Sequence, residues 1–385
     1  MNNILFIDSY YDCKYGAQKS MLSLAHGLSL EQVDVTVGSC KDGILLKSAS
    51  DMNLDVINLE TPEVLLKTRS EMKSFFYFFR YFITLLCYWY DQVKYNKLSK
   101  YNSICINDIR SFLYLLPTLI KFKGNVIWYV RINDRVPFIT SIAGWITNKI
   151  VLISNDCINV FNVIEKKCFK DKIVTLHTGF EFNDVDESLV STLNKKYNPQ
   201  QDKIIYISVG SICQRKNQAS IIDAFYKLNS LDVLILIGSP TTQSDYEYYL
   251  LLKKKCELLD VSHQVHFVDY TNNVLEYLSI SDVFCLASKA EGLPRVLIEA
   301  LYAGCFICTS NVDGVNDIII DTKLGLISNH KASEESFDSD FLKILELSKI
   351  NLNCKSHSHY RREYVQNKFS FDKFIFEFKN IFKYK

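Results

Sequence analysis

Two glutamates with seven residues between them, Glu291 and Glu299, frame the stretch of this chain whose chemistry is most evident. Between them, Pro294 suits the first position of a helix, and residues 295–303 are good helix formers. The apolar run 282–287 just upstream predicts a buried strand. The pattern therefore predicts a strand, a loop with Glu291, a helix N-terminus, and Glu299 just over one turn into the helix.

Such an arrangement has a defined ligand preference. Free backbone N–H groups and the helix dipole make a helix N-terminus an anion site. Two carboxylates beside it accept hydrogen bonds from hydroxyls and repel phosphate. A ligand with phosphates at one end and sugar hydroxyls at the other satisfies both parts. The residues thus indicate a nucleotide-sugar.

The same stretch resembles a known family. Glu-Gly-Leu-Pro opening a Glu-x7-Glu, followed by Ala-Gly-Cys and Asn-Val-Asp-Gly314, is similar to the signature of the retaining glycosyltransferases of family 4 (group 1), which have the GT-B fold. The match runs from about Lys203 to Asp317, and the amino-terminal half matches only in pattern. The resemblance implies two Rossmann-like α/β domains that face each other across a cleft. They would be an acceptor-binding domain (1–185) and a nucleotide-sugar-binding domain (186–365), with a last helix (366–385) that packs back on the first.

The resemblance also implies roles for particular residues. Glu299 would bind the ribose and Glu291 the sugar hydroxyls, while Lys216 would offset charge on the leaving diphosphate. The candidate catalytic residues are Glu291, Lys216 and Arg131. The candidate donor-binding residues are Gly16, Ser211, Arg215, Lys216, Glu291, Gly292, Leu293, Val296, Leu297 and Glu299. Retention in this family is ascribed to front-face attack, so no protein nucleophile is assigned.

The diphosphate motif departs from the family pattern at one position. Ser211 stands where the family often has arginine, so either Arg215 supplies the missing cation or affinity for the diphosphate is lower. The alternative is a solvated Arg215–Lys216 pair at the start of a helix. Cations there are mildly unfavourable without an anion, which argues against that alternative.

Two amino-terminal positions also depart from the pattern. Tyr15 replaces the first glycine of the family's Gly-Gly-Ala loop, which leaves Gly16 either near the donor or as a simple turn residue. Arg131 stands where the family often has histidine. It either contacts a phosphate or an acidic acceptor, or forms a structural salt bridge with Asp134 or Asp108.

Short apolar runs alternate with helical segments in two series, which predicts parallel sheets with helices on both faces. The polar stretch 181–202 between the series is expected to link the domains, and Ser370 is expected to cap the last helix. The predicted strands are 3–8, 33–37, 55–59, 103–107, 125–130, 149–153 and 172–176 in the first series, then 203–209, 232–237, 264–268, 282–287 and 305–309.

Composition argues against several functional classes. A formal net charge of +1 gives no basic field for nucleic acid. No G-x-G-x-x-G follows a strand, which disfavours dinucleotide chemistry. No Asp-x-Asp ends a strand, so we expect neither a metal nor a cofactor, with the nucleotide-sugar as substrate. Twelve cysteines without paired spacing, and no secretory signal at the start, predict a cytoplasmic protein.

The aromatic segment 74–90 predicts contact with a membrane. It is interrupted by Arg80 and falls short of the about twenty apolar residues that a spanning helix needs. Its basic flanks are Lys67, Arg69, Lys73, Lys94, Lys97 and Lys100. Aromatics with basic flanks suit a helix lying on an anionic bilayer, here the inner face of the cytoplasmic membrane. The alternative is an amphipathic helix packed under the amino-terminal sheet.

The sequence therefore predicts a retaining, metal-independent glycosyltransferase. It would move a sugar from a nucleotide-sugar to a glycan, lipid-linked by family habit, in bacterial surface polysaccharide synthesis. One alternative is a nucleotide-sugar epimerase on the same scaffold, which would need an acid and a base but no acceptor. The other is a noncatalytic sugar-nucleotide-binding subunit, suggested by Ser211 and Arg131.

Overall fold

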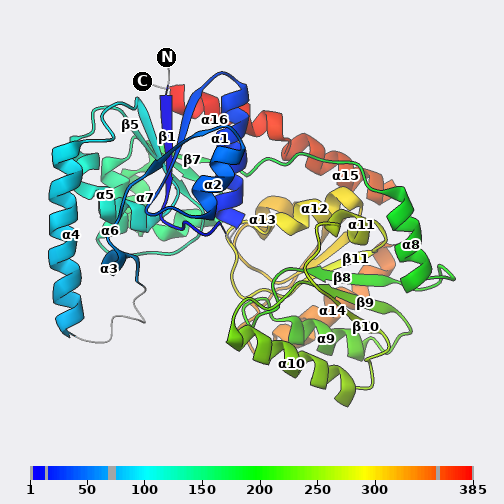
Figure 1. The fold of residues 1–385 in the computed structure, drawn as a ribbon. Helices are drawn as coiled ribbons and strands as arrows, with labels where there is room; N and C mark the ends of the chain where they lie inside the picture. The colour runs from blue at the N-terminus through cyan, green and yellow to red at the C-terminus, as the bar shows by residue number, and fades with distance from the viewer. Residues whose placement is uncertain (1–2, 14–15, 68–74, 353–355, 384–385) are drawn as a thin grey trace. The chain divides into compact units, whose positions relative to one another are not determined.

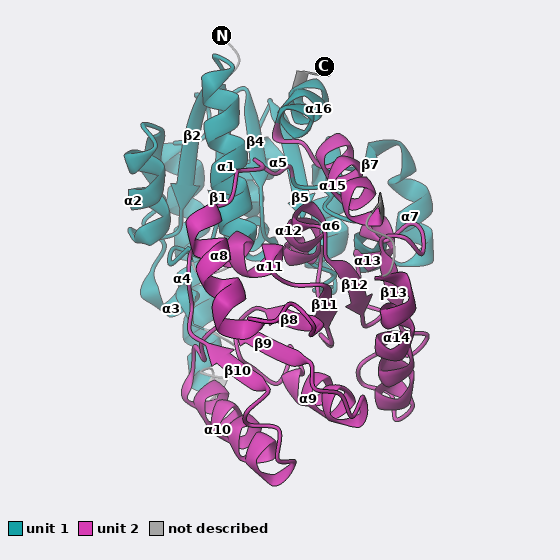
Figure 2. Ribbon diagram, turned by 90° about the vertical axis from the view of Figure 1, so that its right-hand side faces the viewer, with its two compact units in different colours: residues 1–178, 372–385 teal, residues 179–371 magenta. Residues whose placement is uncertain are grey.

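The chain folds into two compact units, each built on a parallel β-sheet covered by helices (Figures 1 and 2). The computed structural model describes residues 3–13, 16–67, 75–352 and 356–383. Unit 1 comprises residues 1–178 and 372–385, and unit 2 comprises residues 179–371. The predicted α/β class is confirmed, and each predicted strand is found with ends within two residues of the expected ones.

Unit 1 contains a seven-stranded sheet in the order β3-β2-β1-β4-β5-β6-β7. Its inner strands are buried on both faces, which is why they read as nearly continuous apolar runs, whereas the edge strands β3 and β7 are partly exposed. The strands are β1 (Asn3–Asp8), β2 (Asp34–Ser39), β3 (Asp55–Asn58), β4 (Ser103–Ile106), β5 (Asn125–Val130), β6 (Lys149–Leu152) and β7 (Ile173–Thr175). The helices are α1 (Gly16–Leu30), α2 (Ile44–Asp51), α3 (Glu63–Leu66), α4 (Phe75–Tyr95), α5 (Ile109–Lys121), α6 (Ile139–Ile146), α7 (Val163–Cys168) and α16 (Phe371–Lys383).

The strand order of unit 1 runs outward in two directions from β1 and β4. Right-handed crossovers then place α1 and α2 on one face of the sheet and α3 to α7 on the other, as Figure 1 shows. The last helix, α16, joins the first face. Its Phe378 lies against Phe6 and Tyr129, with ring centroids 5.8 Å and 6.4 Å apart. The carboxyl-terminal helix therefore packs on the amino-terminal unit.

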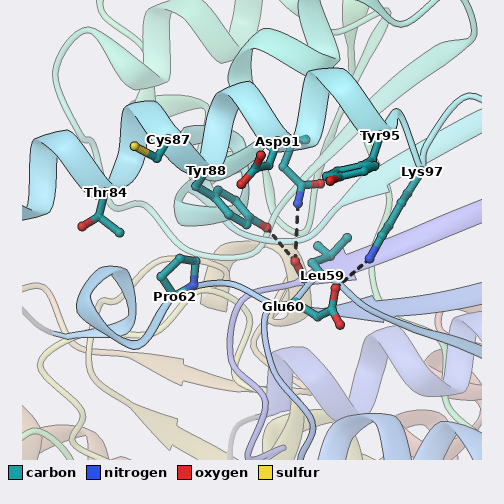
Figure 3. A pocket seen from close by; sticks show the side chains of 10 residues that line it. Leu59, Glu60, Pro62, Thr84, Cys87, Tyr88, Asp91, Tyr95 and Lys97 are labelled. Carbon is teal, nitrogen blue, oxygen red and sulfur yellow. Dashed lines mark hydrogen bonds and ion pairs between the residues drawn. The ribbon is translucent and has the colours of Figure 1, made fainter.

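Helix α4 is the predicted aromatic helix, and one of its faces is buried against unit 1. The Tyr88 hydroxyl donates to the Leu59 carbonyl at 3.0 Å, and the Trp89 indole donates to the Leu113 carbonyl on α5 at 2.8 Å. A pocket lies between α4 and the loop after β3, where Lys97 pairs with Glu60 at 2.8 Å (Figure 3). Arg69, Lys73 and Ser74 lie outside the described residues. Among the described helices, none is long and apolar enough to cross a membrane.

Unit 2 contains a six-stranded sheet in the order β10-β9-β8-β11-β12-β13. The strands are β8 (Ile205–Val209), β9 (Val233–Ile237), β10 (Val265–Val268), β11 (Val283–Leu286), β12 (Phe306–Thr309) and β13 (Gly325–Ile327), the last of which was not predicted. The helices are α8 (Glu187–Tyr197), α9 (Gln218–Lys227), α10 (Gln243–Leu258), α11 (Val274–Ser279), α12 (Arg295–Ala303), α13 (Val315–Ile318), α14 (Phe337–Asn351) and α15 (Ser356–Lys368).

The prediction that 181–202 is a linker is wrong, because this stretch contains α8 and belongs to unit 2. The Asp186 side chain caps the helix by accepting from the Ser188 and Leu189 amides. Leu193 and Tyr197 are buried, and these two apolar residues hold an otherwise polar helix on unit 2. The chain instead passes between units at residues 178 and 179. At the other crossing, Ser370 immediately precedes α16 and forms a β-bridge with Phe180.

Candidate active site

The predicted order of strand, loop and helix around Glu291 is present in unit 2. Strand β11 leads into the loop that holds Glu291, and α12 begins at Arg295 and ends at Ala303. Pro294 was predicted at the first helical position but lies one residue before the helix. Its ψ of 86° is not helical, although its carbonyl accepts the Leu297 amide at 3.0 Å. Gly304 ends the helix in a left-handed conformation (φ 100°), the usual role of glycine there.

Glu291 forms ion pairs with the two candidate cations of the diphosphate motif. Lys216 Nζ lies 2.7 Å from Glu291 Oε1, and Arg215 Nη1 lies 3.2 Å from the same oxygen. The side chains of Lys216 and Glu291 are 14% and 13% exposed, whereas that of Arg215 is 50% exposed. Burial raises the pKa of Glu291, but Lys216 and Arg215 outweigh it and leave the pKa below its ordinary value. The Glu291 carboxylate is therefore ionised at neutral pH, and its ion pair with Lys216 is only partly open to solvent.

The strand-end geometry of β8 places Lys216 beside Glu291. Gly210 follows β8 with φ 150°, and a Cβ there would lie 3.2 Å from Lys216 Cε. Gly238 follows β9, and a Cβ there would lie 2.0 Å from the Gly210 carbonyl oxygen. Ser211 is half-buried, and its backbone carbonyl accepts a hydrogen bond from the side-chain Nε2 of Gln218 at 3.0 Å. The side chain of Ser211 faces Cys213, with Oγ and Sγ 3.8 Å apart, rather than Glu291.

The segment Asn-Val-Asp-Gly314 packs directly on the Glu-Gly-Leu-Pro loop. Gly314 has φ 80°, and a Cβ at this position would lie 2.5 Å from the Gly292 carbonyl oxygen and 3.0 Å from Leu293 Cα. Only glycine permits this approach without strain or displacement. Asn-Val-Asp-Gly314 therefore fixes the position of the Glu-Gly-Leu-Pro loop that carries Glu291.

The other predicted donor contacts lie on the loop and the first turns of α12. Gly292, Leu293 and Leu297 are buried, whereas Val296 and Glu299 are half-buried. Because the Leu297 side chain is in the core of unit 2, only its backbone is available to a ligand. Glu299 makes no hydrogen bond or ion pair with the residues that the structure describes. Burial raises the pKa of Glu299, and nearby Arg295 offsets part of that effect.

Two further candidates, Gly16 and Arg131, lie in unit 1. Gly16 is exposed at the start of α1, and a Cβ there would meet nothing within 4 Å. Its neighbour Tyr15 lies outside the described residues. Arg131 is 6% exposed, and its guanidinium lies 3.6 Å from the centre of the Tyr129 ring. Burial lowers the pKa of Arg131.

The salt-bridge alternative for Arg131 is wrong. Its Nε donates to Asn107 at 2.7 Å and its Nη1 to Ser20 at 2.8 Å. Among the described residues, no ion pair joins Arg131 to Asp134 or Asp108. Asp108 instead caps α5, accepting the Arg110 and Ser111 amides, which uses its carboxylate locally.

Asp8, Gln18 and Asn107, which no sequence motif marks, join Arg131 in one buried network. Gln18 donates to the Asp8 carboxylate at 3.0 Å, and Asn107 donates to the same oxygen while accepting from Arg131. Burial, with a smaller effect of Asp108, raises the pKa of Asp8 to about 7. Asp8 is the last residue of β1 and Asn107 follows β4, and the sheet order reverses between these two strands. Ligands of open α/β sheets bind at this point, which is the signal that could have found them.

A metal site is not evident within the described ranges. No group of three or more His, Cys, Asp or Glu side chains there is arranged to hold an ion. Lys216, Arg215 and Glu291 form a cluster of paired charges at the loop.

Comparison with known proteins identifies the segment that carries this loop. Residues 190–361 match the model of a family described as glycosyl transferases group 1. Two curated relatives match over a similar stretch. The "Capsular polysaccharide biosynthesis glycosyltransferase CapH" of Staphylococcus aureus is 28% identical over 170 residues, 43% of this chain and 43% of that protein. An "N-acetylgalactosamine-N,N'-diacetylbacillosaminyl-diphospho-undecaprenol 4-alpha-N-acetylgalactosaminyltransferase" of Campylobacter jejuni is 27% identical over 173 residues, which are 45% of this chain and 43% of that protein.

The chain thus aligns with somewhat less than half the length of each curated relative. A solved structure is similar over nearly the whole chain. Alr3699/HepE of Anabaena, in complex with UDP, has a TM-score of 0.77 at 13% identity and covers 99% of both chains. The predicted GT-B fold class is therefore confirmed.

Proposed function

We propose, from the membership of residues 190–361 in the glycosyl transferases group 1 family, that this protein transfers a sugar from a nucleotide-sugar to a glycan acceptor. The observation that carries the proposal is the Lys216–Glu291–Arg215 cluster beside the start of α12, inside the matched segment. It joins cations for a diphosphate to a carboxylate for sugar hydroxyls. A capsular polysaccharide relative supports surface polysaccharide synthesis as the process.

In the proposed mechanism, the donor diphosphate lies against Lys216 and Arg215. Negative charge on the diphosphate grows as the glycosidic bond breaks, and the cations offset it without an ion from solution. Glu291 holds Lys216 in place at 2.7 Å before the donor arrives and then accepts from sugar hydroxyls. Glu299, with no other partner among the described residues, accepts from the ribose. The sugar is transferred with retention of configuration, and no protein nucleophile is assigned.

The unit 1 candidates complete the proposal. Gly16 would let the donor approach the exposed start of α1. Arg131, buried on Asn107 and Ser20, would act as a positioning residue for the loops after β4 and β5. A UDP complex of a structural neighbour supports a nucleoside diphosphate as the leaving group.

We place the acceptor on a lipid carrier at the inner face of the cytoplasmic membrane. A relative whose name includes a diphospho-undecaprenol supports the carrier. The exposed face of α4 supports the membrane contact, because Phe76, Phe79, Ile83 and Tyr90 follow one another at helical spacing and are at least 45% exposed.

The proposal is tested by a panel of nucleotide-sugars. The true donor is expected to raise the midpoint of thermal unfolding by mass action, and unrelated nucleotides are not. The stabilising donor is then incubated alone and with lipid-linked acceptors. Transfer only in the presence of an acceptor supports the proposal. Conversion of the sugar without acceptor indicates an epimerase, and binding without either reaction indicates a noncatalytic subunit.

Glu299→Ala is expected to weaken donor binding more than it lowers kcat. A ribose contact changes little between ground and transition states, so its loss appears mainly in KM. The contact needs the ionised carboxylate, and burial raises the pKa of Glu299. Donor affinity of the wild type should therefore fall as the pH falls through that pKa, and affinity of the variant should not. Isothermal titration over a pH series measures both, and equal pH profiles would remove Glu299 from the donor site.

Transfer activity is expected to survive excess EDTA. The charge on the leaving diphosphate is offset by Lys216 and Arg215, and within the described residues no set of hard oxygen ligands is arranged for magnesium. Initial rates with EDTA, and with added manganese or magnesium as control, measure this. Activity that disappears with EDTA and returns only with a divalent ion contradicts metal independence.

A further inference from the structure

The loop between β5 and α6 holds an aromatic side chain in a strained conformation. Phe138 has φ 67° and ψ −51°, and the Ile139 amide donates to the Pro137 carbonyl at 2.8 Å. These values define a γ-turn of the rare, strained kind. The Phe138 side chain is 82% exposed, so it makes little contact within the protein in return. Strain that the fold does not use is a reason to look for a partner.

Four other exposed apolar side chains lie on α6 and at the start of α7, the helices that follow Phe138 in the chain. Ile142 and Trp145 follow it at helical spacing on α6, and Val163 and Ile164 open α7. Trp145, Val163 and Ile164 are between 64% and 73% exposed. We call Phe138, Ile142, Trp145, Val163 and Ile164 the Phe138 patch. Single exposed apolar residues are ordinary. These five lie on two segments that are in contact, since Ser141 on α6 bonds to Glu165 on α7 and Trp145 on α6 contacts Phe169 just after α7, and together they mark a candidate interaction surface.

A buried carboxylate ties the parts of the patch together. Glu165 on α7 accepts two hydrogen bonds from Arg135, at 2.6 Å and 3.1 Å, and a third from Ser141 on α6. The Asn162 amide also donates to it, at 2.8 Å. These hydrogen bonds lower the pKa of Glu165 to about 2, and the bond with Arg135 has the largest effect. The patch is therefore held in one arrangement before any partner binds.

The charge beside the patch favours an anionic partner. The segment 163–172 carries four lysines against Asp171 and Glu165, and the latter is already paired with Arg135. Lys167 and Lys170 are exposed and form no ion pair with the described residues. A second copy of the chain would bring these like charges together, whereas an anionic bilayer would pair with them.

The Phe138 patch lies on the same side of the unit 1 sheet as α4. Helix α4 packs on α5 and α5 packs on α6, so the exposed face of α4 and the Phe138 patch belong to one layer of helices on one face of the unit 1 sheet (Figure 1). We propose that the Phe138 patch is a second lipid-contact surface of unit 1, in which Phe138 and Trp145 enter the interfacial region of an anionic bilayer and Lys167 and Lys170 meet its headgroups. This deepens the membrane association in the proposed function and does not depend on the sugar-transfer reaction.

The variant Phe138→Gly distinguishes lipid contact from a role in folding. If Phe138 contacts lipid, the variant should be more stable to heat but bind vesicles more weakly; if Phe138 supports the fold, the variant should be less stable. Glycine adopts positive φ freely, so removing the strain should raise the midpoint of thermal unfolding. The same change removes a large apolar side chain. The loss of a group of this size should lower the constant for partition of the protein into the bilayer about tenfold. Binding to phosphatidylglycerol vesicles, measured by co-sedimentation, should fall by about that factor. Leu231→Gly, which removes a 78% exposed side chain from unit 2, is the matched control and should leave vesicle binding unchanged.

Tryptophan fluorescence reports the contact directly. Of the three tryptophans, Trp128 is buried and Trp89 is half-buried, while Trp145 is 64% exposed. Vesicles with brominated acyl chains should quench the wild type, and most of that quenching should be absent in Trp145→Phe. Lys167→Gln with Lys170→Gln should weaken binding to anionic vesicles and leave binding to neutral vesicles unchanged.

Three results would overturn the proposal. One is unchanged vesicle binding by a folded Phe138→Gly protein, which leaves α4 as the membrane contact and does not affect the transferase assignment. Another is equal quenching in Trp145→Phe and wild type. The third is a concentration-dependent dimer in sedimentation velocity that Phe138→Gly dissociates without any loss of vesicle binding, which would make the patch an interface between copies.

Discussion

Lys216→Ala is expected to lower kcat about 10²–10³-fold, or roughly 3–4 kcal/mol in the free energy of the transition state. The Lys216 ammonium group is 14% exposed and lies 2.7 Å from Glu291, so it acts in a site with little competing water. Its charge matters most when the bond to the diphosphate is breaking, because charge on the leaving group is then growing. Steady-state rates with the donor found in the binding panel measure the effect, and KM for that donor should change less than kcat.

The ion pair with Glu291 requires controls for this result. Lys216→Ala removes the nearer cation from a largely buried carboxylate, so the pKa of Glu291 should rise and some stability should be lost. Adding Glu291→Gln should restore stability without restoring kcat. Lys289→Ala removes an exposed lysine from the same loop and should leave kcat unchanged. If Lys216→Ala retains wild-type kcat, or the double variant recovers it, Lys216 is structural and the mechanism proposed here is wrong.

The strands and the helix at the site could be predicted because their signals are local. Apolar runs between polar ends gave β1, β5 and β11, and α12 lies between Pro294 and the left-handed Gly304. β13 has three residues, which is too short to show a period. Helix α8 was missed because its capping aspartate and two buried residues stand in a mainly polar segment.

The pairing of side chains could not be predicted, because it depends on contacts between distant segments. The motifs place Lys216 and Glu291 at different parts of the ligand, and no local pattern indicates that the two side chains pair with each other across two loops. Arg131 had acidic residues close in sequence, yet it bonds to Ser20 on α1 and Asn107 after β4. The conformation of Phe138 likewise has no sequence signal, since aromatic residues rarely adopt positive φ.

Gly238→Ala is expected to destabilise unit 2 by about 3 kcal/mol or more. Gly238 has φ 143°, a region that residues with a Cβ rarely adopt, and the strain alone costs roughly 1–3 kcal/mol. The new Cβ would also lie 2.0 Å from the Gly210 carbonyl oxygen, which is backbone and cannot rotate away. Relief requires β8 and β9 to separate where they end, and this displaces the segment that carries Ser211 and Lys216. Urea unfolding gives the loss of stability, and donor affinity should fall in the fraction that remains folded.

Gly16→Ala is the matched control for Gly238→Ala, because a Cβ at Gly16 meets nothing within 4 Å and α1 begins there. Alanine favours the helix, so the free energy of unfolding should stay within about 1 kcal/mol of the wild type or rise. If Gly16 admits the donor, this variant should lose transfer activity at full stability, whereas Gly238→Ala should lose both together. A stable Gly238→Ala protein with wild-type donor affinity would show that the ends of β8 and β9 do not position Lys216.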